Sequence, residues 1–213
     1  MKKLTVFILI FALSFTVCNA DFKDVISDAY NSGSEAVFTD IENVPWAHEA
    51  INYFVQNGII KQNFEKKLYP NQYITREEFV DVLISAFGIY DTTATCSFID
   101  ISDEYYGCIA TANKCGIVNG ISETQFAPDM SITREQGVVM LFRAFNVLGI
   151  TPEAKDAQIP DEALISDYAL DAVNTLYAEG IIKGMADGSF APQNTMTRAE
   201  AAVLICRLPD KIN

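Results

Sequence analysis

The sequence predicts an all-α fold in which three tandem helical repeats close into a pseudo-threefold bundle. One five-residue stretch occurs three times in similar form, and its arginines, Arg76, Arg134 and Arg198, are separated by 58 and 64 residues. A glycine stands 18 residues before each arginine, and a proline stands six residues before it. Such recurrence is typical of stacked repeats. A unit of about 55 residues with two helices has little core of its own, so the three units are expected to share one.

Each copy of the stretch predicts the start of a helix. A threonine is followed three residues later by glutamate or glutamine, which is the pattern of a capping box. The threonine hydroxyl accepts from an amide of the first turn and the later side chain reaches back, which stabilises a helix by about 1 kcal/mol. The three pairs are Thr75 with Glu78, Thr133 with Gln136, and Thr197 with Glu200.

The arginine in each copy falls at the first helical position, where a cation opposes the helix dipole by about 0.3–1 kcal/mol. Its recurrence there predicts a role other than helix formation. One interpretation is an anion pocket, in which the arginine and free amides at the helix start hold a carboxylate or phosphate. The other is that each arginine pairs with an aspartate of a neighbouring repeat and only holds the array together. The residues by themselves leave both interpretations open.

The first unit, residues 38–92, is predicted to contain two helices. Pro45 is a natural first residue for the earlier helix, and apolar residues follow it at helical spacing. Gly58 is expected to end that helix, because glycine readily adopts the left-handed conformation after a last turn. A loop then leads through Pro70 to the second helix, which begins at the capping box.

The second unit, residues 93–152, and the third unit, residues 153–213, repeat this plan. Both have a glycine-rich turn after the first helix, with second glycines at Gly120 and Gly184. Both then have a Phe-Ala-Pro loop before the capping box. The same two-helix unit is therefore expected three times.

Residues 1–20 are predicted to be a secretory signal peptide. Lys2 and Lys3 give it a positive start, an apolar run follows, and the small residue Ala20 precedes the expected cleavage point. The apolar run is too short for a comfortable membrane span, so no membrane insertion is expected after cleavage. Residues 21–37 are predicted to form a short leader segment.

The acidic composition limits the possible partners. The formal net charge is −13, and cleavage of the signal would remove two lysines as well. Nucleic acids and anionic lipid surfaces need a basic face, so neither is expected as a partner. A bound anion would have to be held by local groups against the field of the whole protein.

Little in the sequence points to catalysis. His48 is the only histidine, which excludes His-based triads and histidine-rich metal sites, and it is expected to face solvent. No pair of carboxylates stands out as the acid and base of a glycosidase. No catalytic residue, metal site or cofactor is therefore predicted. Cys96 could pair with Cys108 or Cys115 in an oxidising space, and the sequence does not decide this.

The motifs of the three units form a specific set. In varying completeness, each unit has an opening Phe-x-Asp, a Gly-Ile-Ile-x-Gly turn, an Asp-Gly-x-Phe-x-Pro loop and a Thr-Arg-Ala-Glu helix start. This set resembles the S-layer homology domain family over residues 38–208, with the third unit as the best match. The resemblance implies a three-pronged, non-catalytic module that anchors exported proteins at the cell surface. Its implied partner is a bacterial secondary cell wall polysaccharide, which in many species carries an acidic pyruvyl ketal.

The resemblance also implies which residues would bind the carbohydrate. They are the helix-start arginines, the aromatic residues that open the first helix of a unit, and the glycine-rich turn with its lysine. In this sequence they are Arg76, Arg134, Arg198, Trp46, Tyr168, Lys61, Lys183, Gly120 and Gly184. For Trp46 and Tyr168, simple packing beneath the loop is the alternative.

Three departures from the family pattern predict that the grooves are unequal. Glu104 occupies the aromatic position of the second unit, Asn119 the lysine position, and Gln62 the second glycine of the first unit. One or two grooves are therefore expected to bind. Two other functions stay open: an S-layer or envelope component that binds other envelope proteins, and a secreted wall carbohydrate hydrolase.

Overall fold

The computed structural model describes residues 38–60, 65–153 and 157–207. The predicted signal peptide, the leader segment and Lys61 lie outside these residues. Within them the chain forms α-helices and short 3-10 helices and no strand, so the all-α prediction is confirmed. In chain order the elements are η1 (Pro45–Ala47), α2 (His48–Gln56), α3 (Arg76–Phe87), α4 (Asp103–Lys114), α5 (Arg134–Val147), η2 (Glu162–Leu164), α6 (Asp167–Ala178) and α7 (Arg198–Cys206).

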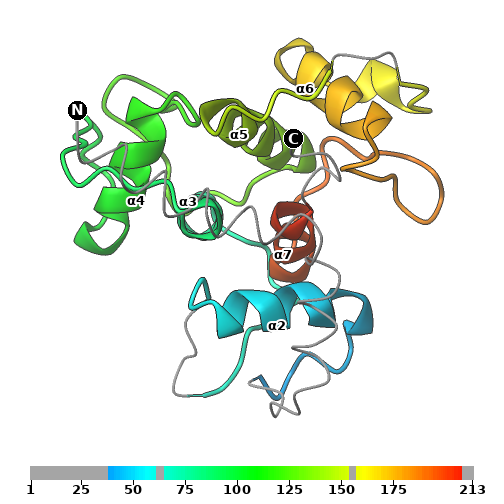
Figure 1. The fold of residues 1–213 in the computed structure, drawn as a ribbon, viewed down its shortest axis with the longest axis horizontal. Coiled ribbons are helices and arrows are strands. Elements are labelled where there is room, and N and C mark those ends of the chain that lie inside the picture. Colours follow the sequence, from blue (N-terminus) through cyan, green and yellow to red (C-terminus); the bar gives the residue numbers. More distant parts are fainter. Residues whose placement is uncertain (1–37, 61–64, 154–156, 208–213) are drawn as a thin grey trace.

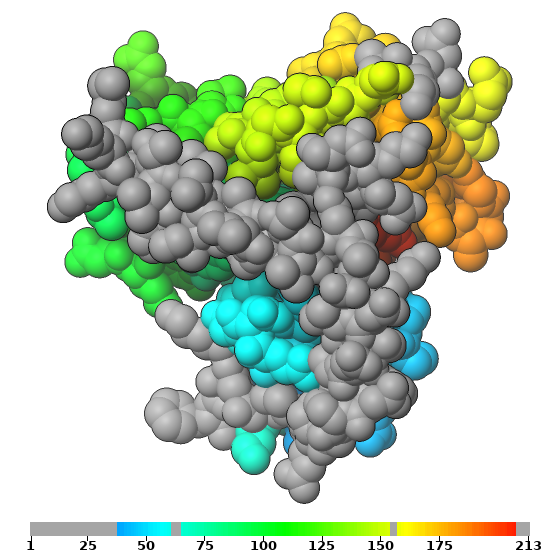
Figure 2. All heavy atoms as spheres, viewed as in Figure 1, coloured from blue at the N-terminus to red at the C-terminus, as the bar shows by residue number. Residues whose placement is uncertain are grey.

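Three helical arms extend from the centre of the molecule (Figure 1). Each arm pairs the second helix of one unit with the first helix of the next, so α3 packs on α4 and α5 packs on α6. The third arm pairs α7 with α2, which joins the last unit to the first. In the space-filling view, α2 (blue to cyan), α4 (green) and α6 (yellow-orange) lie on different sides (Figure 2). The arms are shared between units because a unit alone cannot bury both of its helices.

A cycle of backbone hydrogen bonds joins the three units at the centre. It involves the residue directly before each capping threonine, which is Ile74, Ile132 or Met196. The amide of Ile74 donates to the carbonyl of Met196 (3.0 Å), and the amide of Met196 donates to the carbonyl of Ile132 (3.1 Å). The amide of Ile132 completes the cycle at the carbonyl of Ile74 (3.4 Å). The predicted pseudo-threefold closure is confirmed.

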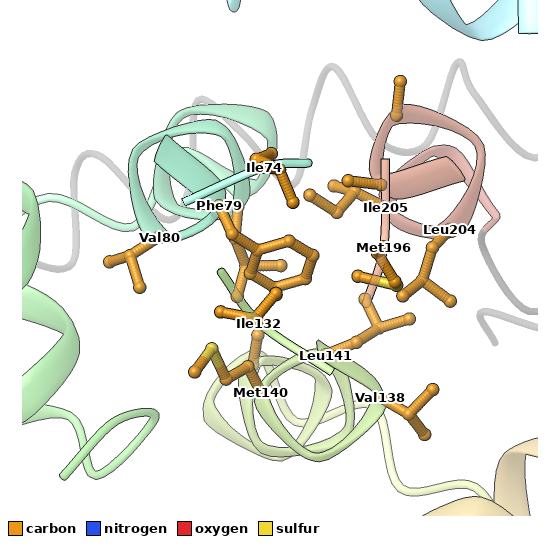
Figure 3. Packing of buried hydrophobic residues seen from close by; sticks show 14 of the residues in the cluster. Ile74, Phe79, Val80, Ile132, Val138, Met140, Leu141, Met196, Leu204 and Ile205 are labelled. Carbon is orange, nitrogen blue, oxygen red and sulfur yellow. The ribbon is translucent and has the colours of Figure 1, made fainter. Parts of the chain in front are cut away.

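The hydrophobic core is continuous across the three units. Phe79 of α3, Leu141 of α5 and Leu204 of α7 are buried around the central cycle (Figure 3). Burial of a side chain of this size stabilises the fold by about 1.5–3 kcal/mol. Gly137 lets α5 approach this centre, because a Cβ at that position would lie 2.7 Å from the terminal methyl group of Met196.

An aspartate near the start of each unit fixes the loop that leads to the capping box. Asp100 accepts hydrogen bonds from the amides of Phe126 (2.8 Å) and Ala127 (2.8 Å). Ala127 has a φ of 61°, which a residue with a side chain adopts only where its surroundings hold it. Burial raises the pKa of Asp100, but these two amides outweigh it and hold the pKa below its usual value. The equivalent contacts are Asp40 with Leu68 and Tyr69, and Asp161 with Phe190 and Ala191.

The predicted helix starts are confirmed, whereas the expectation for the histidine is not met. All three capping boxes are present, at the N-termini of α3, α5 and α7. His48 is half-buried and its Nε2 lies 2.7 Å from the carbonyl oxygen of Ile41, so the expectation that it faces solvent was wrong. The four cysteines in the described part of the chain are free thiols: Cys96, Cys108, Cys115 and Cys206.

Candidate functional site

Each helix-start arginine reaches across to the following unit in the ring. We call the three places where this happens junctions and name them by the units they join. Junction 1–2 contains Arg76, junction 2–3 contains Arg134, and junction 3–1 contains Arg198. The arginines therefore hold the units together, as one of the two interpretations expected, although the partners are not aspartates.

At junction 1–2, Arg76 binds two backbone carbonyls of the second unit. Its Nε donates to Phe126 (3.1 Å) and its Nη2 donates to Asn119 (2.6 Å). The guanidinium carbon also lies 4.6 Å from the centre of the Phe126 ring, within range of a cation–π interaction. Burial lowers the pKa of Arg76, the neighbouring Arg143 lowers it further, and Tyr168 opposes this shift. Arg76 makes no ion pair with a carboxylate in the described ranges.

At junction 2–3, Arg134 is more deeply buried, with 9% of its surface exposed. Its Nη2 donates to the carbonyl of Lys183 (2.7 Å), and its guanidinium carbon lies 5.2 Å from the centre of the Phe190 ring. Its Nε is buried without a hydrogen-bond partner among the described residues. Burial lowers the pKa of Arg134, Glu200 opposes the shift and Arg207 adds to it. No ion pair joins Arg134 to a described carboxylate, so its charge stays largely uncompensated.

At junction 3–1, Arg198 forms an ion pair with Glu78 of the first unit. The Nη2 and Nε of Arg198 each contact a different carboxylate oxygen of Glu78, which is a bidentate arrangement. Nη1 of Arg198 donates to the carbonyl of Leu68 (3.2 Å) and to the side chain of Gln72 (3.2 Å). The charge of this arginine is therefore compensated inside the protein.

The amides at the helix starts are not free, so this part of the anion-pocket interpretation was wrong. In α5, the amide of Arg134 donates to the carbonyl of Asn194 (2.9 Å) and the amide of Glu135 donates to that of Pro192 (3.0 Å). The hydroxyl of the capping Thr133 accepts from the third amide, that of Gln136. Equivalent bonds occur in α3 and α7, because the loop of the following unit lies across each helix start. An anion at a junction must therefore be held by side chains.

The two aromatic residues predicted to contact carbohydrate are both accessible. Trp46 is 57% exposed and Tyr168 is 54% exposed, which is more than packing beneath a loop would leave. Tyr168 lies close enough to Arg76 to raise its pKa by electrostatic interaction, so it belongs to junction 1–2. From the threefold relation among the units, we expect Trp46 to lie at junction 2–3. The residue at this position in junction 3–1 is Glu104, which lines a cavity together with Arg198.

Tyr168 is fixed by a buried carboxylate that the sequence analysis did not single out. Glu135, 2% exposed, accepts from the Ser166 amide (3.0 Å), the Ser166 hydroxyl (2.7 Å) and the Tyr168 hydroxyl (2.7 Å). It thereby caps the N-terminus of α6 from another helix. Burial raises the pKa of Glu135, but these hydrogen bonds outweigh it and lower the pKa below its usual value. This helix position holds glutamate in the first unit (Glu77) and alanine in the third (Ala199), so the sequence alone did not mark the role of Glu135.

The glycine-rich turns lie directly at the junctions. A Cβ on Gly120 would lie 2.4 Å from the Phe98 ring, and one on Gly184 would lie 3.0 Å from the Gly188 carbonyl oxygen. These glycines are therefore required by the close approach of the loop. The Lys183 side chain is exposed beside Gly184.

A second arginine reaches one of these turns. Arg143 of α5 donates to the Ile117 carbonyl in the turn of the second unit (3.3 Å). Arg207 is its counterpart after α7, nine residues beyond the helix-start arginine in both cases, and the first unit has Ser85 at that position. Neither arginine was among the predicted site residues, although their common spacing is visible in the sequence.

Comparison with known proteins agrees with this architecture. The S-layer homology domain pattern matches residues 37–80, 98–136 and 159–202, which together make up more than half of the chain. The chain belongs to the S-layer homology domain family. This membership makes it a protein of the cell surface built around a non-catalytic anchoring domain. In the described residues, no helix is long and apolar enough to cross a membrane, and no cluster of side chains suits a metal ion.

Several S-layer homology relatives are larger proteins. The chain is 32% identical to an amylopullulanase of Thermoanaerobacterium thermosulfurigenes over 83% of its own length and 10% of the relative. It is 27% identical to the surface-layer 125 kDa protein of Lysinibacillus sphaericus over 84% of its length and 16% of the relative. It is 28% identical to a cellulosome-anchoring protein of Acetivibrio thermocellus over 65% of its length and 32% of the relative. The chain thus spans less than a third of each of these relatives.

Proposed function

We propose that this chain attaches to the bacterial cell surface by binding an acidic secondary cell wall polysaccharide without covalent bonds, and that it performs no reaction itself. Its family membership supports this, as do the relatives named as a surface-layer protein and a cellulosome-anchoring protein. The acidic group that we expect is a pyruvyl ketal, because a single carboxylate suits one or two cationic side chains at a junction.

The observation that carries the proposal is the difference in charge among the junctions. Arg76 and Arg134 are bound to backbone carbonyls and to no described carboxylate, so each keeps a positive charge at its junction. Arg198 is neutralised by Glu78. We therefore assign anion binding to junctions 1–2 and 2–3.

Junction 2–3 is the principal site in this proposal. Arg134 is too deeply buried to form the main contact, but its charge raises the potential beneath the turn. The exposed ammonium group of Lys183 supplies the direct contact with the carboxylate. The indole of Trp46, more than half exposed, offers a flat apolar surface for one face of a sugar ring.

Junction 1–2 is a weaker version of the same site. Arg76 and Arg143 supply the positive charge there, and Tyr168 replaces Trp46. Asn119 stands where junction 2–3 has Lys183, so no flexible ammonium group reaches the ligand from the turn. We expect this junction to hold a second repeat of the same polymer with lower affinity.

The experiment is cosedimentation with purified wall sacculi, before and after chemical removal of the secondary polysaccharide. We expect binding to intact sacculi only, weakening with added salt because the contact is between charges near the surface. The double variant Lys183→Ala with Trp46→Ala should bind at least about tenfold more weakly, since it removes a charged hydrogen bond and an aromatic contact.

A matched control is Lys114→Ala, which removes the same charge from α4, where Lys114 pairs with Asp91. This variant should bind sacculi as the wild type does. Equal binding to stripped and intact sacculi would refute the polysaccharide as the ligand. Full binding by the double variant would refute the assignment to junction 2–3.

A further inference from the structure

The residues around the pseudo-threefold axis form a set that the proposed anion sites do not use. Three antiparallel bridges join the units there, and every bridged residue carries a hydroxyl group. The pairs are Tyr73 with Thr197, Thr75 with Ser131, and Thr133 with Thr195. Consecutive members are either bridged or two positions apart in the chain, so the set closes on itself. We call these six residues the axial ring.

All six side chains of the axial ring lie on one face. In each pair, the flanking residues exchange the backbone hydrogen bonds between units, and the paired residues do not. Such a non-hydrogen-bonded pair has Cα atoms about 4.5 Å apart and side chains close together. Successive residues of an extended chain point to opposite faces. The intervening residues Ile74, Ile132 and Met196 lie in the core (Figure 3), so the ring points away from the core.

The axial ring is open to solvent and has hydroxyl groups to spare. Tyr73 is 61% exposed, Ser131 is exposed as well, and Thr195 is half-buried. The capping threonines use their hydroxyls on amides of the first helical turns. The hydroxyls of Tyr73, Ser131 and Thr195 have no hydrogen-bond partner among the described residues. Three hydroxyls and one aromatic ring are therefore available to a ligand.

The chemistry of the ring suits an uncharged sugar. The ring contains no carboxylate, ammonium or guanidinium group, although the whole chain has a net charge of −13. Hydroxyl side chains both donate and accept, which matches the hydroxyl groups of a sugar. The Tyr73 side chain adds a flat apolar surface with a polar tip. An extended peptide fits less well, because it needs an unpaired strand edge and the flanking backbone groups are already bonded.

The axial ring adjoins the proposed anion sites, since a junction arginine directly follows each capping threonine. We infer that the ring is a second contact for the wall polysaccharide, which binds an uncharged sugar of the chain through stacking on Tyr73 and hydrogen bonds to Ser131 and Thr195. This inference rests on the proposed function, because the ligand is the polymer held at junction 2–3. Two contacts on one polymer chain add affinity, because the second forms at a high effective concentration.

The test uses the full chain and two forms of the wall polysaccharide, measured by isothermal titration calorimetry. One form is the native polymer released from sacculi, and the other is the same polymer after reduction of its carboxylates to alcohols. We expect the native form to bind more tightly, because it uses both contacts. The reduced form should bind through the ring alone, with an affinity that added salt does not change.

Variants of two exposed tyrosines separate the ring from the rest of the surface. Tyr73→Ala should weaken binding of both forms about fivefold, the loss expected for one aromatic contact. Tyr73→Phe keeps the aromatic ring and should bind both forms within about twofold of the wild type. Tyr90→Ala is the matched control, because Tyr90 is 55% exposed and its hydroxyl lies 2.7 Å from that of Ser85, near the other end of α3. The control should bind as the wild type does.

The axial contact and the proposed function fail in different ways. Lys183→Ala with Trp46→Ala should weaken binding of the native polymer alone. If the wild type and Tyr73→Ala bind the native polymer equally, the axial contact is overturned and the proposed function is not. If the wild type binds neither form, both are overturned. A molecular mass that rises with concentration for the wild type, but not for Tyr73→Ala, would overturn the inference by showing that a second copy covers the ring.

Discussion

The buried carboxylate of Glu135 allows a sharp test of how one arm is held together. We predict that Glu135→Ala destabilises the protein by about 2–4 kcal/mol. The variant removes an acceptor for the Ser166 amide, the Ser166 hydroxyl and the Tyr168 hydroxyl. Tyr168 is half-exposed and can turn to water, but the Ser166 amide at the start of α6 loses its partner. Ser166 is partly buried, so leaving its amide without an acceptor costs up to about 1–3 kcal/mol, and the lost charge-assisted bonds account for the rest.

The chain supplies a matched control at the equivalent position of α3. Glu77 is the second residue of its helix, as Glu135 is, so both alanine variants lose the same helix-dipole contribution of about 0.3–1 kcal/mol. Burial raises the pKa of Glu77, and Asp129, Glu78 and Glu104 raise it further, while no hydrogen-bond donor among the described residues offsets them. Glu77→Ala should therefore change the free energy of unfolding by less than about 0.5 kcal/mol.

Urea unfolding followed by circular dichroism measures the free energy of unfolding of both variants. The contributions of Glu135 and Glu77 to this free energy should change with pH in opposite directions. The pKa of Glu135 is lowered in the folded state, so its contribution is present above the usual glutamate pKa of 4.5 and is lost as the pH falls through the lowered value. The pKa of Glu77 is raised, so its ionised form opposes folding at neutral pH and this penalty disappears in acid. Equal destabilisation by the two variants at neutral pH would refute the reasoning.

Two further predictions concern the second unit. Gly120→Ala should destabilise the protein by about 3 kcal/mol, because the added Cβ would clash with Phe98. Gly107→Ala in α4 should stabilise it by about 0.5–1 kcal/mol, because a Cβ there meets nothing within 4 Å. Thermal unfolding of both variants checks this prediction, and equal effects of the two variants would contradict it. The hydrogen bond from Lys114 lowers the pKa of Asp91 from 3.8 to about 2, so this contribution to stability is present above pH 3.8 and is lost towards pH 2. Asp91→Asn should therefore flatten the acid dependence of unfolding in that interval, and an unchanged curve would show that the pair does not contribute.

Much of the fold was predictable because the signals are local. A capping box needs only a threonine and a residue three positions later, and α3, α5 and α7 begin where these residues predicted. Closure was predictable from energetics, because three two-helix units cannot each bury a core. The exchange of helices between units was not predicted, since helical spacing gives the apolar face of a helix and not the helix it packs on.

The site was predictable only in part, for a similar reason. The repeated arginines identified the junctions, and Trp46 and Tyr168 lie exposed at the helix starts. It was not predictable that the helix-start amides are already hydrogen-bonded, because the carbonyls that accept from them belong to loops of another unit. Nor did the chain show that Glu78 would neutralise Arg198, since the two residues are 120 positions apart.

The sequence by itself determined the three-unit plan, the helix starts and the family, because each depends on residue types at short, repeated spacings. Only the tertiary structure decided which arginine keeps its charge. That charge depends on the glutamate, glutamine or loop carbonyl that another unit places beside the guanidinium group. Electrostatic energy falls with distance in space, and ring closure brings together residues that are far apart in the chain.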